Sequence, residues 1–367
     1  MIPTRSRNRS VNHLKNKRIL VTGACGTVGR ELVRQAVEEF EVAECIGIDN
    51  NESELFFLDQ EFGGDGRGKF FLGDVRDRDK LMRRLRGVDV VFHAAALKHV
   101  GLCERSPFEA VQSNILAIQN LVGAACENGV ERVVFTSSDK AVNPTNVMGT
   151  SKLMGERLIS AANTTLHGDG PVFVSTRFGN VLGSRGSVLP IFRRQIAQGG
   201  PVTLTDREMT RFVMSCEQAV RLVLDSAHLG CGGEVLITKM PVVRIEDLAN
   251  VMIERLAPKY GHDPANIEIQ EIGAKPGEKM YEELMSQEET GRTWELDRYF
   301  VVRPAFPSLY RDIEYDYENL VSREVTNPYN SSLEPALSRD EVGRFLEENG
   351  LLEPADCADE PAERNFP

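Results

Sequence analysis

The chain has 367 residues, of which 41% are hydrophobic and 27% charged, so it can form a large core and two lobes. Its formal net charge of −12 argues against the basic surface that non-specific nucleic-acid binding requires, and no apolar run approaches the roughly 20 residues of a membrane span. The seven cysteines show neither a paired nor a metal-ligand spacing, so we expect a cytoplasmic protein with free thiols and no metal site.

A glycine-rich turn joins the first predicted strand to the first predicted helix. The apolar run 18–22 predicts the strand, and apolar residues at helical spacing after residue 30 predict the helix. Between them, Gly23, Gly26 and Gly29 would let backbone N–H groups approach a pyrophosphate at the positive end of the helix. The spacing is GxxGxxG rather than GxGxxG, and a tight turn that serves only helix packing is the alternative.

Acidic residues follow the second and third predicted strands, 44–48 and 69–72. Asp49 lies about 20 residues past the last glycine, where a carboxylate accepts hydrogen bonds from the adenosine ribose hydroxyl. Because it would repel the additional phosphate of NADP, we expect NAD as the cofactor. Asp74 and Val75 follow the third strand, where we expect a contact to adenine. The alternative in each case is an ordinary acidic turn.

The fourth predicted strand, 88–92, is almost continuously apolar, which indicates a strand buried on both faces of a parallel sheet. Ala94 and its alanine neighbours follow, with side chains small enough to let a cofactor lie against the backbone. A helix at 108–125 precedes the next strand, 132–135. This alternation predicts an α/β fold, a Rossmann-type doubly wound parallel sheet with a smaller, partly interleaved C-terminal substrate lobe.

The stretch 133–152, VVFTSSDKAVNPTNVMGTSK, places polar side chains at the carboxyl end of a predicted strand, where chemistry is found in open α/β sheets. Met148 and Lys152 have the spacing at which a nicotinamide reductase carries Tyr and Lys. Met148 has no ionisable group and cannot serve as the base. Lys152 would hold the nicotinamide ribose hydroxyls, the alternative being an exposed lysine on a helix that merely packs Met148.

Asp139 and Lys140 are therefore the candidates for acid–base chemistry. A carboxylic acid could protonate a poor leaving group such as hydroxide, and an amine with a lowered pKa could remove a carbon-bound proton beside a ketone. Together with NAD they suit an internal redox elimination, in which a sugar is oxidised at C4, loses water across C5 and C6, and regains hydride at C6. A solvated Asp–Lys turn is the structural alternative.

Six motifs occur in order over roughly residues 17–300, namely TGACGTVG, FHAAALKHV, SSDKAVNPTNVMGTSK, TRFGNVLGSRGSVLPIF, MTRFVM and KPGEKMYEEL. Together they resemble the extended short-chain dehydrogenase/reductases, and most closely the UDP-N-acetylglucosamine 4,6-dehydratases of capsule, flagellin and O-antigen polysaccharide biosynthesis. The resemblance implies a lyase that holds NAD tightly, takes a UDP-sugar as substrate and forms a homo-oligomer. Larger relatives carry an N-terminal membrane region that is not seen here, so we expect a soluble form.

The resemblance also implies a role for each matching position. Asp139 matches the acid for the C6 hydroxyl, Lys140 the base at C5, and Ser138 a hydroxyl near the sugar O4. Lys152 matches the cofactor-ribose lysine. Met148 is a known variant of the tyrosine position, and it leaves open which group accepts the O4 proton and whether C5 is inverted or retained. The expected substrate contacts are Lys98, Asn180, Arg211 to the pyrophosphate and Glu278 to the uridine.

Changes in sequence character predict the domain organisation. We expect a basic N-terminal arm (1–16), an NAD-binding Rossmann domain (17–178, with 211–240 returning to it), a nucleotide-sugar-binding lobe (179–310), a C-terminal extension with a capped helix (311–352) and a disordered tail (353–367). Two other functions fit parts of the sequence. A UDP-sugar 4-epimerase would use the hydride transfer without the Asp–Lys pair, and a catalytically inactive NAD-binding scaffold would explain the missing tyrosine.

Overall fold

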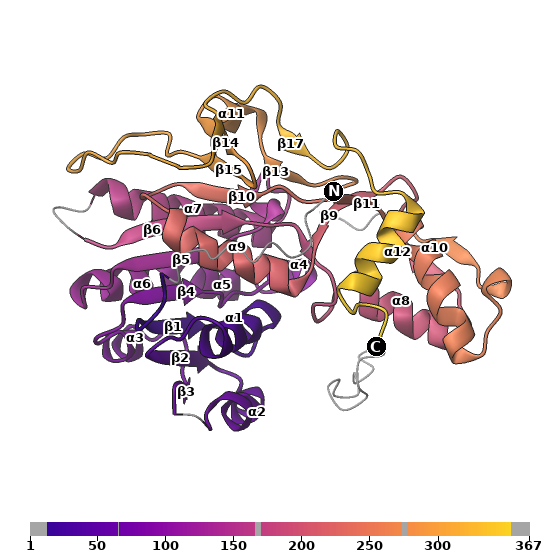
Figure 1. Ribbon diagram of the computed structural model, residues 1–367, viewed down its shortest axis with the longest axis horizontal. Coiled ribbons are helices and arrows are strands. Elements are labelled where there is room, and N and C mark those ends of the chain that lie inside the picture. The colour runs from indigo at the N-terminus through magenta and orange to yellow at the C-terminus, as the bar shows by residue number, and fades with distance from the viewer. Residues whose placement is uncertain (1–12, 65, 166–169, 274–276, 354–367) are drawn as a thin grey trace.

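A mixed sheet forms the centre of the molecule, and its larger part is parallel (Figure 1). The parallel strands among the described residues follow the spatial order β3 (Gly68–Leu72), β2 (Glu44–Asp49), β1 (Arg18–Thr22), β4 (Val90–His93), β5 (Arg132–Thr136), β6 (Val172–Arg177) and β10 (Val235–Thr238). The order runs outward from β1 in both directions, which confirms the expected doubly wound sheet. The carboxyl ends of β1 and β4 therefore lie at the switch point, where such sheets bind ligands.

The structure is a computed structural model and describes residues 13–64, 66–165, 170–273 and 277–353. Most of the expected N-terminal arm and nearly all of the expected disordered tail lie outside these residues.

Helices cover both faces of the parallel part of the sheet, so its central strands, such as β4 and β5, are buried on both sides. On one face α1 (Thr27–Glu38) packs against α9 (Cys216–Leu229), with α2 (Glu52–Phe62) beside β3. On the other face α6 (Ala117–Glu127) lies between α3 (Arg78–Arg84) and α7 (Val147–Thr165). The two apolar cores on either side hold the strand ends in fixed positions.

The single helix expected at 108–125 is divided. The chain forms α4 (Val100–Arg105) and α5 (Pro107–Val111), then a π-helical turn η1 (Gln112–Leu116) that leads into α6. A π-helical turn frequently marks a functional position. Here it carries Asn114, whose contacts are described below.

Three antiparallel strands extend the sheet beyond β10. They are β15 (Tyr299–Val302), β14 (Thr293–Leu296) and β16 (Leu320–Ser322). Within the range 179–310, which we expected to hold the partly interleaved nucleotide-sugar-binding lobe, β14 and β15 belong to the main sheet and cover the edge that β10 would otherwise expose. From the range 211–240, α9 and β10 also lie in the main body.

A smaller lobe lies beside the main sheet (Figure 1). It contains α8 (Val188–Ala197), α10 (Ile245–Leu256), α12 (Arg339–Glu348), the short helices η3 (Ala257–Tyr260) and η4 (Pro264–Asn266), and the paired strands β8 (Val202–Leu204) and β12 (Ile269–Glu271). Ser338 and Glu341 form the expected capping box of α12. Because Phe345 and Leu346 of α12 share a core with α10, this helix is part of the lobe rather than a separate extension.

Two small sheets connect the lobes. One contains β7 (Asn180–Val181), β9 (Thr210–Met214) and β11 (Val242–Arg244), and the other contains β13 (Glu283–Met285) and β17 (Tyr329–Asn330), followed by α11 (Gln287–Thr290). These connections place side chains from both lobes beside the end of β5.

Candidate active site

The glycine turn brings three backbone segments into contact at the switch point. Gly23 has φ 67°, and a Cβ there would lie 2.7 Å from the Cα of Ala95, next to Ala94. A Cβ on Gly29 would lie 2.0 Å from the carbonyl oxygen of Gly23. Any side chain at either position would therefore collide with neighbouring backbone atoms, so glycine is needed for these segments to pack closely at the start of α1. Gly26 precedes α1 as its N-cap with an extended backbone.

Asp49 lies at the end of β2, directly beside this turn. Its carboxylate accepts hydrogen bonds from the backbone N–H groups of Cys25 and Asn51, each at 3.0 Å. Asp74, at the end of β3, instead pairs with Arg76 at 2.6 Å, and the hydrogen bond from Arg76 lowers the pKa of Asp74 despite the opposing effect of burial. Asp49 is thus next to the glycine turn. The contact of Asp74 and half-buried Val75 with adenine stays a prediction.

Lys152 is buried on the inner side of α7. Its Nζ donates a hydrogen bond to the carbonyl of Thr136 at 2.9 Å and lies 4.8 Å from the centre of the Phe135 ring. Burial lowers the pKa of Lys152 to about 8, because the ammonium loses hydration. One turn earlier, Met148 is buried against Cys103 and Ala110, so the position of the usual tyrosine is filled by a packed, unreactive side chain.

Two buried polar residues near this position were not assigned a role from the sequence. The side chain of Asn114 accepts a hydrogen bond from the backbone N–H of Leu97 at 2.8 Å and donates one to the Leu97 carbonyl at 3.0 Å. It also donates to the Ser151 hydroxyl at 2.9 Å. It thereby fixes the segment that leads to Lys98. His93 shares a 2.7 Å hydrogen bond with Thr22, and burial lowers the pKa of its imidazole to about 3.

Asp139 and Lys140 lie on a short 3₁₀ turn, η2 (Asp139–Ala141), directly after β5. The Ser138 hydroxyl caps this turn by accepting the backbone N–H of Lys140 at 3.2 Å, and it donates to the Asp139 carboxylate at 2.5 Å. The Nζ of Lys140 lies 3.0 Å from the other oxygen of Asp139. Asp139 is only 3% exposed, so this acid is held away from bulk water.

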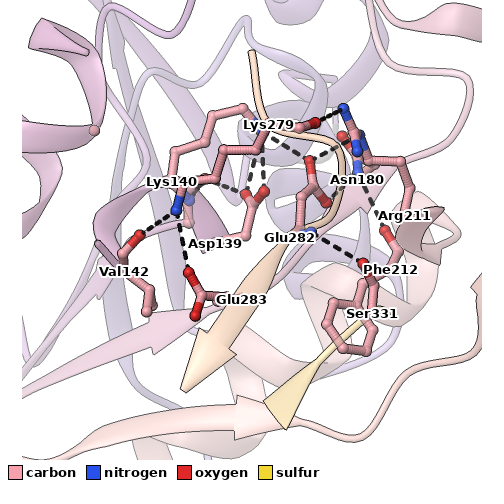
Figure 2. A network of polar contacts seen from close by, with 12 residues as sticks. Asp139, Lys140, Val142, Asn180, Arg211, Phe212, Lys279, Glu282, Glu283 and Ser331 are labelled. Carbon is pink, nitrogen blue, oxygen red and sulfur yellow. Dashed lines mark hydrogen bonds and ion pairs between the residues drawn. The ribbon is translucent and has the colours of Figure 1, made fainter. Parts of the chain in front are cut away.

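Glu282, which is 142 residues away in sequence from Lys140, completes the cluster (Figure 2). Its carboxylate lies 3.4 Å from the Nζ of Lys140 and 3.2 Å from the Nε of Arg211. Asn180 donates to its other oxygen at 2.7 Å. The structure therefore brings four of the predicted residues, Asp139, Lys140, Asn180 and Arg211, around one carboxylate that the sequence analysis did not single out.

The charges in this cluster determine the protonation of Lys140. Burial acts to lower its pKa, but the carboxylates of Asp139 and Glu282 outweigh burial and raise it. The expected amine with a lowered pKa is therefore wrong for this arrangement, because two anions stabilise the ammonium. Burial and the neighbouring Asp139 raise the pKa of Glu282 to about 7. For Asp139, burial acts to raise the pKa, but the charge of Lys140 and the hydrogen bonds with Glu282, Ser138 and Lys140 together lower it.

Arg211 mainly holds the segment that carries Glu282. Its guanidinium is 9% exposed and donates to the carbonyls of Thr210, Lys279 and Met280 at 2.8 to 3.2 Å. Since most of its donors already have partners, its contact to a pyrophosphate stays a prediction.

Lys98 and Glu278 lie outside the central cluster. Lys98 is exposed and donates to the carbonyl of Arg185 at 3.0 Å. Glu278 is also exposed, and it accepts a hydrogen bond from Thr205 at 3.3 Å. Their roles in substrate binding stay predictions.

The motif KPGEKMYEEL contains the missed residue Glu282, together with Glu278 and Glu283. No spacing within the motif distinguishes the buried acid from the two others, so only the fold identifies it. Among the described residues, no group of His, Cys, Asp or Glu is arranged to hold a metal ion, and no helix is long and apolar enough to cross a membrane.

Comparison with known proteins places this site in a family. Residues 19–304 match the polysaccharide biosynthesis protein family. An uncharacterized membrane protein of Methanocaldococcus jannaschii is 47% identical, over 93% of this chain and 98% of that protein. A UDP-N-acetylglucosamine 4,6-dehydratase (inverting) of Campylobacter jejuni is 36% identical, over 83% and 88%. A UDP-glucose 4-epimerase of Rickettsia canadensis is 37% identical, over 82% and 85%.

Two solved structures show the same fold. The X-ray structure of Pen from Bacillus thuringiensis has a TM-score of 0.85 at 38% identity, over 93% of this chain and all of that chain. DesIV of Streptomyces venezuelae, a dTDP-glucose 4,6-dehydratase solved with NAD and TYD, has a TM-score of 0.63 at 25% identity, over 72% and 86%. The chain therefore belongs to the polysaccharide biosynthesis protein family, within the extended short-chain dehydrogenase/reductase fold.

Proposed function

We propose that this protein is an NAD-dependent UDP-N-acetylglucosamine 4,6-dehydratase, which forms a UDP-4-keto-6-deoxy-N-acetylhexosamine. One observation carries the proposal. Asp139 and Lys140 form an acid–base pair 3.0 Å apart at the carboxyl end of β5, in addition to the residues that hydride transfer needs. The curated relative from Campylobacter jejuni, with this activity in its name, supports the choice of substrate.

The switch point fits NAD. Gly23 and Gly29 let the backbone of the turn pack closely at the start of α1, where N–H groups can approach a pyrophosphate, and Asp49 presents a carboxylate beside the turn for a ribose hydroxyl. Lys152, at the start of α7, would bind the second ribose, and Ala94 leaves the backbone accessible. When bound, NAD supplies a hydride acceptor for C4 of the sugar and a hydride donor for C6.

The side chains of the cluster account for the proton transfers. Ser138 would lie near the sugar O4 and pass the O4 proton to Asp139, to which its hydroxyl is bonded at 2.5 Å. Asp139 then delivers that proton to the C6 hydroxyl, which leaves as water. Lys140 removes the proton from C5 and later protonates C5 again. In this scheme Met148 needs no chemical role.

The sugar nucleotide would be held by the predicted contacts, for which the chain offers Lys98, Asn180, Arg211 and Glu278. A homo-oligomeric state and a cytoplasmic location are further expectations from the family resemblance. The UDP-sugar 4-epimerase is the second candidate, because a relative with that name is 37% identical. It would leave the pair of buried Asp139 and half-buried Lys140 without a function.

The substitution Lys140→Ala tests the proposal. Wild-type protein should convert UDP-N-acetylglucosamine to a 4-keto-6-deoxy sugar, and the variant should lose elimination by a factor on the order of 100 or more while it still retains NAD. Lys259→Ala, in the smaller lobe, is the matched control. Full activity of Lys140→Ala, or C4 epimerisation by the wild type, would contradict the dehydratase assignment.

A further inference from the structure

The arrangement around Lys140 raises a problem for the proposed chemistry. An ammonium group has no lone pair and cannot remove a proton from carbon. The Nζ of Lys140 has Asp139 at 3.0 Å and Glu282 at 3.4 Å, and both anions favour the ammonium. Before Lys140 can act at C5, some group has to take its Nζ proton.

Asp139 cannot be that group, because it has to hold the proton destined for the C6 hydroxyl. Among the described residues, Glu282 is the other carboxylate recorded in contact with Nζ of Lys140. It is 5% exposed, so exchange with bulk water is restricted. Asn180 and Arg211 hold its two oxygens, and its backbone N–H donates to Ser331 at 2.9 Å (Figure 2). This carboxylate is fixed in place beside the Lys140 amine.

We propose that Glu282 takes the Nζ proton of Lys140 before C5 deprotonation and returns it at the end of each turnover. The inference rests on the proposed dehydratase function and deepens it. Glu282 acts through Lys140 and is a positioning residue rather than a group that contacts the substrate.

The protons balance over one turnover without any exchange with solvent. In the resting site Asp139 and Glu282 are anions and Lys140 is an ammonium. The O4 proton passes through Ser138 to Asp139, and the Nζ proton passes to Glu282. Neutral Lys140 takes the C5 proton, and Asp139 gives its proton to the departing hydroxyl. After hydride returns to C6, Lys140 gives one of its Nζ protons to C5 and takes one from Glu282.

The electrostatics of Glu282 fit this task. The charged groups that face it are Asp139 and Lys140 on η2 and Arg211 on β9. Burial and the Asp139 charge raise the pKa of Glu282 to about 7, more than the two cations lower it. A carboxyl group with this pKa can both accept and release a proton near neutral pH. Because Glu282 has to be an anion at the start, elimination should become faster as the pH rises through about 7.

The variant Glu282→Gln keeps the shape of the side chain and removes its proton acceptor. C4 oxidation should continue, whereas elimination should slow by about 100-fold, so that rapid-quench mass spectrometry finds a 4-keto sugar that still carries its C6 hydroxyl. The pH dependence near neutrality should disappear. Glu282→Asp should restore part of the rate. Glu283→Gln removes the adjacent carboxylate, which pairs with Lys279 and Asn143, and should behave like the wild type.

Different results would overturn the two proposals. Elimination by Glu282→Gln at the wild-type rate, with an unchanged pH profile, would refute the role of Glu282 and leave the dehydratase intact. Loss of C4 oxidation and elimination together would also refute it. If wild-type protein does not act on UDP-N-acetylglucosamine, the dehydratase proposal fails. Carboxyl ¹³C NMR then tests Glu282 without substrate, since a glutamate that titrates near neutral pH has to be present and vanish in Glu282→Gln. If Glu282→Gln is unfolded, the pH profile of the wild type and the elimination rate of Glu282→Asp decide whether Glu282 has the proposed role.

Discussion

Lys152 places an ammonium group in a buried position, with the Thr136 carbonyl and the Phe135 ring as its neighbours. Its pKa falls from 10.5 to about 8, which means that folding opposes its charge. A charge that costs stability is retained where it has a use, and a ribose hydroxyl beside the nicotinamide would supply that use. Lys152 is therefore expected to contribute to cofactor binding at the expense of stability.

Replacement of Lys152 by Met should stabilise the protein at neutral pH. The wild-type lysine is protonated in both states at pH 7, so the burial cost is present in full, on the order of 1–3 kcal/mol. As the pH rises from about 8 to above 10.5, the folded lysine loses its proton first and the cost disappears. Urea unfolding measured at the two ends of this pH range should show a higher unfolding free energy for the variant than for the wild type only at the lower pH. The variant should also retain NAD more weakly. An equal gain at both would contradict this account.

The chemistry of adjacent residues was easier to predict than that of distant ones. Asp139 and Lys140 are neighbours on one strand end, so the sequence alone predicted their pairing. Glu282 reaches them only through the fold of the connecting segments. Asp139 and, to a smaller extent, Glu282 raise the pKa of Lys140, which is the reason that the predicted low pKa was wrong.

At the scale of elements, the side chain of Arg177 connects its own strand, β6, to three other elements. At the end of β6 it donates to Glu156 on α7, to Glu289 on α11 and to the carbonyl of Leu284 on β13. All three charged side chains are buried. Because Leu284 follows Glu282 closely, this ion triad also fixes the segment that carries Glu282.

Replacement of Arg177 by Ala should cost about 3–5 kcal/mol of unfolding free energy, since it removes the cation paired with buried Glu156 and leaves Glu289 with Arg292 and Ser286 alone. The exposed pair of Arg207 with Glu246 provides the control, and Arg207→Ala should cost at most about 1 kcal/mol. Chemical denaturation measures both. If the two variants lose similar small amounts, the triad does not hold the segment as described.

Strand and helix periodicity predicted the parallel strands β1 to β5 well, because each is a short apolar run between helical segments. The parallel strand β10 was not predicted. The π-helical turn at Asn114 was not predicted, since it continues the same helical pattern. The antiparallel strands β14 to β16 were not predicted either. Their place is set by pairing with β10, and such long-range pairing leaves no local signal.

At the scale of the whole molecule, the candidate site lies where the main sheet meets the two small connecting sheets (Figure 2). Asp139 and Lys140 come from the end of β5, whereas Asn180, Arg211 and Glu282 come from the connections to the smaller lobe. This arrangement suits a substrate that binds between the main sheet and the connecting segments, with the candidate acid–base pair on one side and its charged neighbours on the other. The epimerase alternative differs in chemistry rather than in architecture, so only the product distinguishes the two.

The most direct test is incubation of the full-length protein with UDP-N-acetylglucosamine in deuterated water, followed by NMR of the sugar. We expect a 4-keto-6-deoxy sugar with deuterium at C5, because deuterated water replaces the exchangeable Nζ protons of Lys140 with deuterium before turnover, and the ammonium that protonates C5 again carries them. The configuration at C5 in the same spectrum distinguishes inversion from retention. An unchanged sugar, or a C4 epimer without deuterium at C5, would contradict the assignment as a 4,6-dehydratase.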